Sequence, residues 1–379
     1  MSPGATIFLV AGARPNFMKI APILSQLKKQ AHFQPVLIHT GQHYDDVMSQ
    51  AFFRDLKLAP PEMNLGVGSG SQARQTGQIM QQFERVVLKR PPELVMVVGD
   101  VNSTVACSLV AAKLHIPVAH VEAGLRSFDR RMPEEINRIL TDTISDYLFT
   151  TCQDANENLL REGIPAEKIY FVGNVMIDSL LEFRQKAQSS SILKNLKLEG
   201  EEYGLMTLHR PSNVDNRETL RDILRAVAKI QEELPIVFPI HPRSRKMLRD
   251  LNLEDEINRI SGIRIIDPVG YIDFLHLMDH ARLVLTDSGG IQEETTVLGI
   301  HCLTLRENTE RPVTVREGTN RVVGSDPERI VREAKAVLGS KVEKLRRPKF
   351  WDGSAAGRIV AVLSENLSKN VSPDKGRKE

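Results

Sequence analysis

Cysteine, charge of one sign and long hydrophobic runs are all scarce in this chain of 379 residues. It has three cysteines, far apart and without a CxxC pair, so a disulfide framework and a zinc ribbon do not fit, whereas a reducing compartment does. No apolar run reaches the roughly 18–20 residues of a membrane-spanning helix, and no basic leader precedes the first apolar stretch. We therefore expect no signal peptide, no membrane partner and a cytoplasmic protein.

The charges nearly cancel, since 50 lysines and arginines stand against 48 aspartates and glutamates, for a formal net charge of +2. Because a dedicated nucleic-acid binder carries a bulk basic excess, we expect no nucleic-acid partner. Hydrophobic residues make up 41% and charged residues 26% of the chain, which are values typical of globular proteins. At roughly 100–200 residues per domain, the length predicts two domains, or three.

Short, continuously apolar runs alternate with longer stretches of helical periodicity. This alternation is typical of parallel α/β sheets, whose strands are covered by helices on both faces. In the first half of the chain the runs lie at 6–12, 35–41, 93–100, 117–124, 146–152 and 169–174. A polar, Ser- and Lys-rich stretch at 182–202 is interpreted as the end of a connecting helix and a linker. The runs then resume at 203–208, 235–240, 262–267, 282–287, 301–305 and 321–324.

The two series of runs predict an α/β fold with two Rossmann-like, doubly wound domains that face each other across a cleft. We place the N-terminal domain at residues 1–175 and the C-terminal domain at residues 176–350. The C-terminal segment, 351–379, ends in charged and turn-forming residues that predict a frayed tail. Ligands of such sheets bind outside the carboxyl ends of the strands, so the interdomain cleft is the expected site.

The loop after the first predicted strand has the composition of an anion site. Gly12 permits a tight exit from the strand, Pro15 suits the first helical turn, and Arg14 and Lys19 would attract a phosphate. Ordinary solvated charges at a helix start explain this loop equally well. No P-loop sequence is present, and the glycine run at 66–70 follows no predicted strand and lacks the dinucleotide fingerprint.

The segment DSGGIQEE at 287–294 is more specific. Gly289 and Gly290 would let a ligand approach the backbone at the start of a helix, so we expect a diphosphate on them and on Ser288. Glu294 lies one turn further and could accept hydrogen bonds from two ribose hydroxyls. A helix cap formed by Asp287 or Ser288 would also account for part of this segment, but such a cap does not require the two glycines.

Three carboxylates stand at the ends of predicted elements. Asp100 and Glu122 end two consecutive strands, and such strands are often neighbours in the sheet. Glu134 follows a proline at a helix start, with Arg138 four residues further on. Taken singly, Asp100 could be a helix cap, and Glu134 and Arg138 could be a surface i,i+4 pair. Three acids near one cleft favour acid–base chemistry.

Two histidines follow strands of the second series. His209 is followed by Arg210, and His241 also has an arginine nearby, which suggests an anionic ligand. Metal binding would also use histidines, but the HExxH and HxH patterns are absent, and we expect no metal. The residues by themselves therefore predict a two-domain enzyme that binds a nucleoside diphosphate derivative and uses carboxylates for proton transfer.

With these motifs in view, the sequence resembles the non-hydrolysing UDP-N-acetylglucosamine 2-epimerases. The similarity runs from the first strand to about residue 324. Its most specific parts are HVEAGLRS (120–127), MPEEINR (132–138) and TDSGGIQEE (286–294), in this order. The other matching segments are GARPNFMK (12–19), TGQHYD (40–45), GDVNST (99–104), LHRPSNVD (208–215), HPRSR (241–245) and ENTERP (307–312).

The resemblance implies a glycosyltransferase-B type fold, in which the last helix crosses back to the first domain. It implies reversible epimerisation of UDP-GlcNAc to UDP-ManNAc at carbon 2, by anti elimination of UDP to 2-acetamidoglucal and readdition on the other face. The product would supply ManNAc for cell-envelope polysaccharides. The resemblance further implies no nicotinamide or other cofactor, no metal and a cytoplasmic homodimer.

Site residues carry over by position within the matching motifs. The catalytic residues implied are Asp100, Glu122, Glu134 and His209, and we choose Glu122 and Asp100 as the proton-transfer pair with Glu134 assisting. The substrate-binding residues implied are Arg14, Lys19, Arg138, Arg210, His241, Ser288, Gly289, Gly290, Glu294 and Arg311. A second UDP-GlcNAc, which activates bacterial members of the family, would involve Gln42, His43 and Arg74.

Two motifs depart from the common family pattern. The chain reads HRPSN at 209–213 where many members read HRRExN, and QHYD at 42–45 where QHRxM is more usual. Members of this branch act on other UDP-2-acetamido sugars, including a 2,3-diacetamido uronic acid, which is the main rival substrate. A hydrolysing epimerase, a UDP-sugar glycosyltransferase and a non-catalytic UDP-sugar sensor are the rival functions. The full set of acids argues against the last two.

Overall fold

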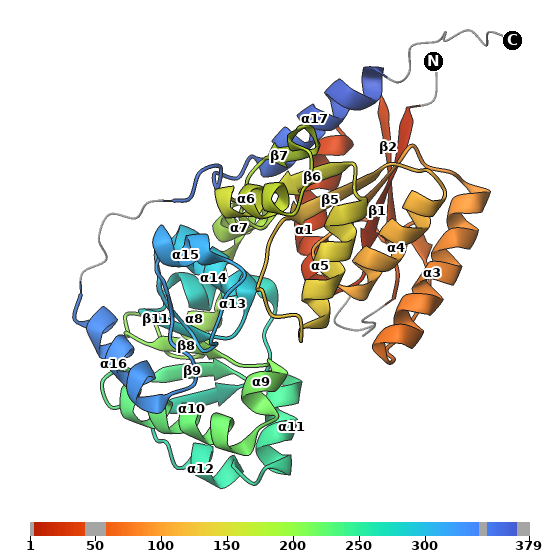
Figure 1. Cartoon of the computed structure of the whole chain (residues 1–379). Helices are drawn as coiled ribbons and strands as arrows, with labels where there is room; N and C mark the ends of the chain where they lie inside the picture. The colour runs from red at the N-terminus through yellow and green to blue at the C-terminus, as the bar shows by residue number, and fades with distance from the viewer. Residues whose placement is uncertain (1–3, 42–57, 341–346, 370–379) are drawn as a thin grey trace, which may run out of the picture. The chain divides into compact units, whose positions relative to one another are not determined.

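The computed structural model describes residues 4–41, 58–340 and 347–369 and divides into two compact units. Unit 1 comprises Met1–Ser179 with Lys349–Glu379, and unit 2 comprises Leu180–Pro348. Each unit contains one parallel sheet with helices packed on it, as Figure 1 shows. This is the doubly wound α/β organisation that the alternating runs predict.

Unit 1 contains a seven-stranded parallel sheet in the order β3-β2-β1-β4-β5-β6-β7. The strands are β1 (Ala5–Ala11), β2 (Phe33–His39), β3 (Met63–Asn64), β4 (Leu94–Val98), β5 (Val118–Ala123), β6 (Tyr147–Thr150) and β7 (Ile169–Phe171). Each of the six apolar runs predicted in this half overlaps one of these strands, although β1 and β2 begin before their predicted runs. The sequence did not predict β3, because two residues cannot show a periodicity. The glycine run at 66–70 follows this short strand, so the expectation that no strand precedes it is wrong.

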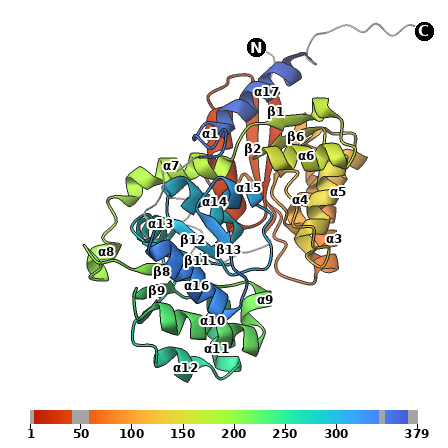
Figure 2. The ribbon, with the colours of Figure 1, turned by 60° about the vertical axis from the view of Figure 1, so that its left-hand side comes forward.

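Helices pack on the unit 1 sheet. They are α1 (Arg14–Leu27), α3 (Gln72–Lys89), α4 (Asn102–Lys113), α5 (Pro133–Ile144), α6 (Gln153–Arg161), a 3-10 turn (Ala166–Lys168) and α17 (Ala355–Lys369). The helix α7 (Val175–Ala187) begins in unit 1 and continues past Ser179 into unit 2. The helices α3, α4 and α5 pack side by side, with the apolar side chains of α3 and α4 against Phe8 and Val10 of β1. Figures 1 and 2 both show α17, in blue, alongside α1, in red.

The C-terminal segment packs on unit 1 through buried polar contacts. Trp351 is 1% exposed, and its Nε1 donates to the carbonyl oxygen of Thr151 at 2.9 Å. The carboxylate of Asp178 accepts from the backbone N–H groups of Ala355 and Ala356, at 3.1 and 2.8 Å, and so caps the first turn of α17. Burial raises the pKa of Asp178 to about 6 despite these two bonds.

Unit 2 contains a six-stranded parallel sheet in the order β10-β9-β8-β11-β12-β13. The strands are β8 (Gly204–Thr207), β9 (Ile236–Pro239), β10 (Ile263–Ile266), β11 (Leu283–Thr286), β12 (His301–Thr304) and β13 (Asn320–Val322). The six apolar runs predicted in the second half each overlap one of them, although β13 begins one residue before its predicted run. The predicted polar connection at 182–202 holds the end of α7 and one short helix, α8 (Ile192–Asn195).

The remaining helices of unit 2 alternate with these strands. They are α9 (Pro211–Val214), α10 (Arg217–Ile230), α11 (Pro242–Asp250), α12 (Glu254–Asn258), α13 (Tyr271–Asp279), α14 (Gly289–Leu298), α15 (Pro312–Arg316) and α16 (Pro327–Leu338). The helix α10 buries apolar residues at helical spacing, among them Leu220, Ile223 and Val227, against α16 and the sheet. Both views show α10 and α16 side by side.

The strand order locates the ligand edge of each sheet. In unit 1 the order reverses between β1 and β4, and in unit 2 it reverses between β8 and β11. Open α/β sheets bind ligands outside the carboxyl ends of the strands at such a switch point. The loops after these four strands are among those that carry the predicted site residues, so topology and motif agree on where the chemistry lies in each unit.

Candidate active site

Glu122 occupies a backbone bulge at the end of β5. The register of β5 with β6 shifts between Val121 and Ala123, and Glu122 has a φ of 70°, in the left-handed region. A residue with a Cβ adopts this conformation at a cost of about 1–2 kcal/mol, and such residues cluster at functional sites. Glu122 is also 3% exposed, so a strained backbone holds a buried carboxylate here.

Lys19, on α1, contacts this carboxylate. Its Nζ lies 2.5 Å from Oε2 of Glu122, and the two side chains are 11% and 3% exposed. Gly99 lies alongside, since a Cβ there would lie 3.4 Å from the same Nζ. The structure therefore brings together two predicted site residues that lie 103 positions apart in the chain. The ammonium expected to attract a phosphate is held here by a carboxylate of the protein.

Asn16, which sequence reasoning did not single out, fixes the loop that precedes α1. Its Oδ1 accepts from the backbone N–H groups of Gly12, at 3.2 Å, and Ala13, at 2.8 Å, and its Nδ2 donates to the carbonyl oxygen of Val98 at the end of β4. The loop after β1 is thereby tied to the neighbouring strand across the switch point. Arg14 is the first residue of α1.

Asp100 follows β4 and pairs with Arg138 of α5. Arg138 Nε lies 3.1 Å from Oδ2 of Asp100, and Asn137 Nδ2 donates to the Asp100 carbonyl oxygen at 2.9 Å. Asp100 lies two residues before the first residue of α4, Asn102, and the residue between them, Val101, makes no side-chain cap bond. Since β4 and β5 are neighbours, the expectation that Asp100 and Glu122 follow adjacent strands is confirmed.

The i,i+4 pair between Glu134 and Arg138 is absent from the described residues. Arg138 is 2% exposed and instead contacts Glu135, the next residue along. Glu135 is 1% exposed and also accepts from the N–H groups of Ser127 and Phe128, whereas Glu134 is only half-buried. The two adjacent acids therefore differ. The carboxylate of Glu135 is buried and hydrogen-bonded within the protein, whereas Glu134 is accessible to a ligand at the start of α5.

A buried network that the sequence did not reveal supports the same loops. His120 of β5 contacts Asp142 of α5 at 2.6 Å through Nδ1 and the Gly99 carbonyl oxygen at 2.9 Å through Nε2. Asp142 also contacts Arg126 at 2.7 Å and the N–H of Gly124 at 3.1 Å. Burial would raise the pKa of Asp142, but the neighbouring His120 and Arg126 outweigh burial and lower it. One ionised carboxylate thus fixes the chain on both sides of Glu122.

In unit 2, His209 follows β8 and contacts an aspartate that follows β11. Its Nδ1 lies 2.9 Å from Oδ1 of Asp287. His241 caps α11, since its Nδ1 accepts from the N–H of Arg243 at 3.1 Å, and its ring centroid lies 5.7 Å from that of His209. Burial, followed by the nearby His209, lowers the pKa of His241. The two predicted histidines therefore lie together at the carboxyl edge of the sheet.

The DSGG segment forms the start of α14 as predicted, but not through the cap considered for it. Ser288 precedes the helix without a side-chain cap bond, and the Asp287 carboxylate faces His209 and Arg210 instead. A Cβ at Gly289 would lie 2.7 Å from a guanidinium nitrogen of Arg311. A Cβ at Gly289 would therefore displace the guanidinium of Arg311, and Gly290 follows Gly289 in the first turn.

Arg311 lies in a buried cluster of opposite charges beside that helix start. Its Nε lies 2.7 Å from Glu293 and its NH1 lies 2.8 Å from Glu310. Arg306 contacts the other oxygen of Glu310 at 2.9 Å, and Arg210 approaches Glu310 at 3.9 Å. In these contacts three guanidiniums meet two carboxylates, an arrangement that suits an anionic ligand.

Glu294 lies on α14 and is 4% exposed. The Tyr271 hydroxyl donates to its Oε1 at 2.7 Å. Burial raises the pKa of Glu294 to about 7, against the hydrogen bond from Tyr271 and together with the nearby Glu293. Half of the Glu294 carboxylate is thus bound by Tyr271, and its protonation changes near neutral pH.

The residues expected at an activating site are only partly described. Gln42 and His43 lie outside the described residues. Arg74 is exposed in the first turn of α3, where Ser71 caps the helix. The structure therefore places Arg74 without its two expected companions.

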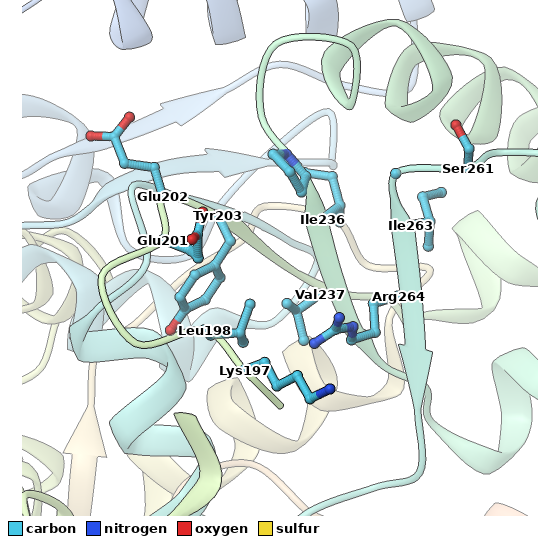
Figure 3. A pocket seen from close by; sticks show the side chains of 12 residues that line it. Lys197, Leu198, Glu201, Glu202, Tyr203, Ile236, Val237, Ser261, Ile263 and Arg264 are labelled. Atoms are coloured by element: carbon cyan, nitrogen blue, oxygen red, sulfur yellow. The ribbon is translucent and has the colours of Figure 1, made fainter. Parts of the chain in front are cut away.

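Features elsewhere in the described residues do not resemble an active site. No group of three or more His, Cys, Asp or Glu residues able to hold a metal is found in the described part of the chain. No helix there is long and apolar enough to span a membrane. A pocket of about 500 Å³ in unit 2 has Tyr203, Ile236 and Ile263 in its wall (Figure 3). These residues precede or begin β8, β9 and β10, so the pocket lies at the amino edge of the sheet, away from the ligand edge.

Fold and site together define a doubly wound α/β protein with two ligand edges of different chemistry. Unit 1 presents carboxylates with a buried lysine and arginine, groups suited to proton transfer. Unit 2 presents a histidine–aspartate pair, a Gly-Gly helix start and a cluster of arginines, groups suited to binding a diphosphate.

Comparison with known proteins gives a consistent result. A family model described as UDP-N-acetylglucosamine 2-epimerase matches residues 25–364. The UDP-N-acetylglucosamine 2-epimerase of Methanocaldococcus jannaschii is 45% identical over 361 residues, which cover 94% of this chain and 98% of that one. The UDP-2,3-diacetamido-2,3-dideoxy-D-glucuronate 2-epimerase of Pseudomonas aeruginosa is 41% identical over 362 residues, with 95% and 99% covered. The crystal structure of the M. jannaschii enzyme in complex with UDP-GlcNAc and UDP superposes with a TM-score of 0.89 at 44% identity, covering 95% of this chain and 100% of that one.

The chain belongs to the UDP-N-acetylglucosamine 2-epimerase family, whose members are isomerases. Its two parallel sheets with flanking helices form the glycosyltransferase-B-like fold of that family. The resemblance read from the motifs is confirmed.

Proposed function

We propose that this protein is a non-hydrolysing 2-epimerase that interconverts UDP-GlcNAc and UDP-ManNAc. The observation that carries the proposal is the strained, buried Glu122 beside Lys19, with Asp100 at the end of the adjacent strand. Binding a UDP-sugar does not require carboxylates of this kind, whereas moving a proton at carbon 2 does. The M. jannaschii relative and its ligand-bound structure support the choice of sugar.

The proposed reaction begins with loss of UDP from carbon 1. The C1–O bond breaks and its electron pair passes to the phosphate oxygen, while a carboxylate takes the proton from carbon 2 and leaves 2-acetamidoglucal. UDP then adds back as a proton is delivered to the opposite face. We assign proton transfer to Glu122 and Asp100 with Glu134 assisting, and Arg138 holds Asp100 in place.

Stabilisation of the departing UDP is assigned to unit 2. The N–H groups at the start of α14, at Ser288, Gly289 and Gly290, suit a diphosphate. The charged side chains assigned to the same ligand are His209, Arg210, His241 and Arg311, with Arg14 and Lys19 contributed by the loop and helix after β1. Glu294 would accept the ribose hydroxyls. We thus assign the sugar ring to unit 1 and the UDP to unit 2, with neither a metal nor a nicotinamide taking part.

Three further properties extend the proposal. We infer a cytoplasmic homodimer that supplies ManNAc for cell-envelope polysaccharides. We also infer that a second UDP-GlcNAc activates the enzyme through Gln42, His43 and Arg74. Hyperbolic initial rates, together with full activity when UDP-ManNAc is the sole sugar nucleotide, would argue against such activation.

A second candidate substrate is a UDP-2,3-diacetamido uronic acid. It is favoured by the 41% identity to the P. aeruginosa enzyme and by the sequence HRPSN at 209–213. A negatively charged uronate would require a cation that UDP-GlcNAc does not need.

The deciding experiment is an NMR time course with UDP-GlcNAc in deuterated water. We expect UDP-ManNAc with deuterium at carbon 2 and no accumulation of free ManNAc. Free ManNAc would indicate a hydrolysing epimerase. If UDP-GlcNAc stays unchanged and undeuterated, the substrate is wrong, and the diacetamido uronate nucleotide is tested next.

A further inference from the structure

Asp287 connects the ends of two paired strands in unit 2. It directly follows β11, and His209 lies two residues after β8, which pairs with β11 in parallel. Asp287 is 0% exposed. Its carboxylate accepts hydrogen bonds from the backbone N–H groups of His209, at 3.0 Å, and Arg210, at 2.9 Å, and from Nδ2 of Asn213 at 3.3 Å. The position of this carboxylate is therefore set by the backbone.

The same carboxylate contacts the ring of His209. The distance of 2.9 Å between Nδ1 and Oδ1 means that Nδ1–H donates to Asp287, which leaves Nε2 for another partner. Burial would raise the pKa of Asp287, but its hydrogen bond with His209, the charge of that ring and the backbone N–H groups outweigh burial and lower the pKa. Asp287 is thus an anion at neutral pH, even though it is fully buried.

The side chains of His209 and Asp287 differ in how far they can move. The side chain of His209 is 38% exposed, whereas that of Asp287 is 0% exposed and held by three further donors. A carboxylate held in this way cannot follow a moving ring. The ring must therefore adopt the orientation that the carboxylate sets.

We propose that Asp287 is a positioning residue for His209. It keeps the proton on Nδ1 and stabilises the imidazolium, so that Nε2–H is directed at the phosphate oxygen of the departing UDP. This inference rests on the proposed function, in which the C1–O electron pair passes to that oxygen. A donor carried by a cationic ring stabilises the developing charge more strongly than a neutral donor.

The other charged groups around His209 increase its dependence on Asp287. His241 approaches from the end of β9, with Arg243 beside it on α11, and Arg210 follows His209 in the chain. Arg243 is paired with Asp215 at 2.5 Å, and Arg210 approaches Glu310 at 3.9 Å, so carboxylates accompany both arginines. Among the described residues, Asp287 is the carboxylate that contacts the His209 ring itself. Loss of its charge would therefore leave the imidazolium without a carboxylate in contact with the ring.

A double-mutant cycle tests the inference in the full-length enzyme. We expect Asp287→Asn to lower kcat by about 10–100-fold with KM changed less than about threefold, and to shift the pH profile of kcat toward lower pH. In the His209→Gln background the same substitution should lower kcat by no more than about twofold, because the imidazole that Asp287 positions is absent. Asp267→Asn is the matched control, since Asp267 also directly follows a strand of this sheet, its side chain is 88% exposed, and kcat should stay unchanged.

A second measurement keeps the inference testable if Asp287→Asn does not fold. In wild-type protein labelled with ¹⁵N-histidine, the neutral His209 ring, assigned by its loss in His209→Gln, should carry its proton on Nδ1. A proton on Nε2 would overturn the inference, as would an unchanged kcat in Asp287→Asn or equal losses in both backgrounds. Absence of epimerisation in the wild type would refute the proposed function alone, since the tautomer is read without substrate.

Discussion

We expect the protonation of Glu294, the proposed acceptor of the ribose hydroxyls, to make binding of the sugar nucleotide depend on pH. With a pKa of about 7, Glu294 is mostly a carboxylate at pH 8 and mostly protonated at pH 6. Ribose hydroxyls donate to the ionised form more strongly, so binding at pH 6 must first remove a proton. One pH unit below the pKa the apparent affinity falls about tenfold, so we expect UDP-GlcNAc to bind about tenfold more weakly at pH 6 than at pH 8.

The assay is isothermal titration of UDP-GlcNAc into the Glu122→Gln variant, in which we expect turnover to be suppressed. UDP-GlcNAc is preferred to UDP because neither its diphosphate diester nor its uracil titrates between pH 6 and pH 8. The matched control adds Glu294→Gln, which should bind more weakly at pH 8 and lose the pH dependence. Equal affinity at both pH values in the first variant, or an unchanged slope in the second, would refute the reasoning.

The same group gives a test that needs no ligand. Because the pKa of Glu294 in the folded protein, about 7, lies above its ordinary value of 4.5, folding takes up a proton between these two pH values. The protonated Glu294 therefore contributes about 3 kcal/mol to the free energy of unfolding below pH 4.5, and this contribution is lost as the pH rises through 7. Glu294→Gln should therefore unfold with a flatter pH dependence than the wild type in urea.

Three further tests, two of them with a matched comparison variant, examine the packing and chemistry of the site. Gly289→Ala places a Cβ against the buried guanidinium of Arg311 and should lower the free energy of unfolding, measured in urea, by about 1–3 kcal/mol. The control is Gly77→Ala, whose Cβ would lie in open space on α3. This variant should leave the free energy of unfolding unchanged or raise it by up to about 1 kcal/mol. Glu135→Gln should lower the free energy of unfolding by about 3–5 kcal/mol, because it removes the charge that Arg138 pairs with. Glu134→Gln should change the free energy of unfolding by less than about 0.5 kcal/mol but lower the epimerisation rate at least about tenfold. Gly124→Ala, with a φ of 78° and its Cβ 2.4 Å from a backbone oxygen, should cost about 3 kcal/mol or more, and a thermal midpoint equal to that of the wild type would contradict the close approach.

The order of elements was largely predictable, because burial on both faces makes each strand a continuous apolar run. Every run predicted as a strand overlaps one, while β3 was missed because two residues carry no periodic signal. Strand-end motifs placed Asp100, Glu122 and His209 at the ligand edges, since a parallel sheet turns its carboxyl ends the same way. Their roles in catalysis stay a prediction.

The supporting residues were not predictable by the same route. His120 and Asp142 lie 22 positions apart, and His209 and Asp287 lie 78 apart, so neither pair produces a local pattern. A polar residue inside an apolar strand, as at His120, is the one signal that could have indicated a buried partner. Glu135 was not singled out because the adjacent Glu134 carries the same carboxylate. Only the orientation of α5 in the fold determines that Glu135 is the buried one.

The sequence alone determined the fold class, the strand edges that carry the chemistry and the family, because these follow from local hydrophobic patterning and from short contiguous motifs. The tertiary structure decided which charges meet: Lys19 with Glu122, Arg138 with Asp100 and His209 with Asp287. It also decided that Glu122 lies on a bulge with a left-handed backbone. The physical reason is that burial and ion pairing depend on distances in space, which strand order and register set and which no spacing along the chain records.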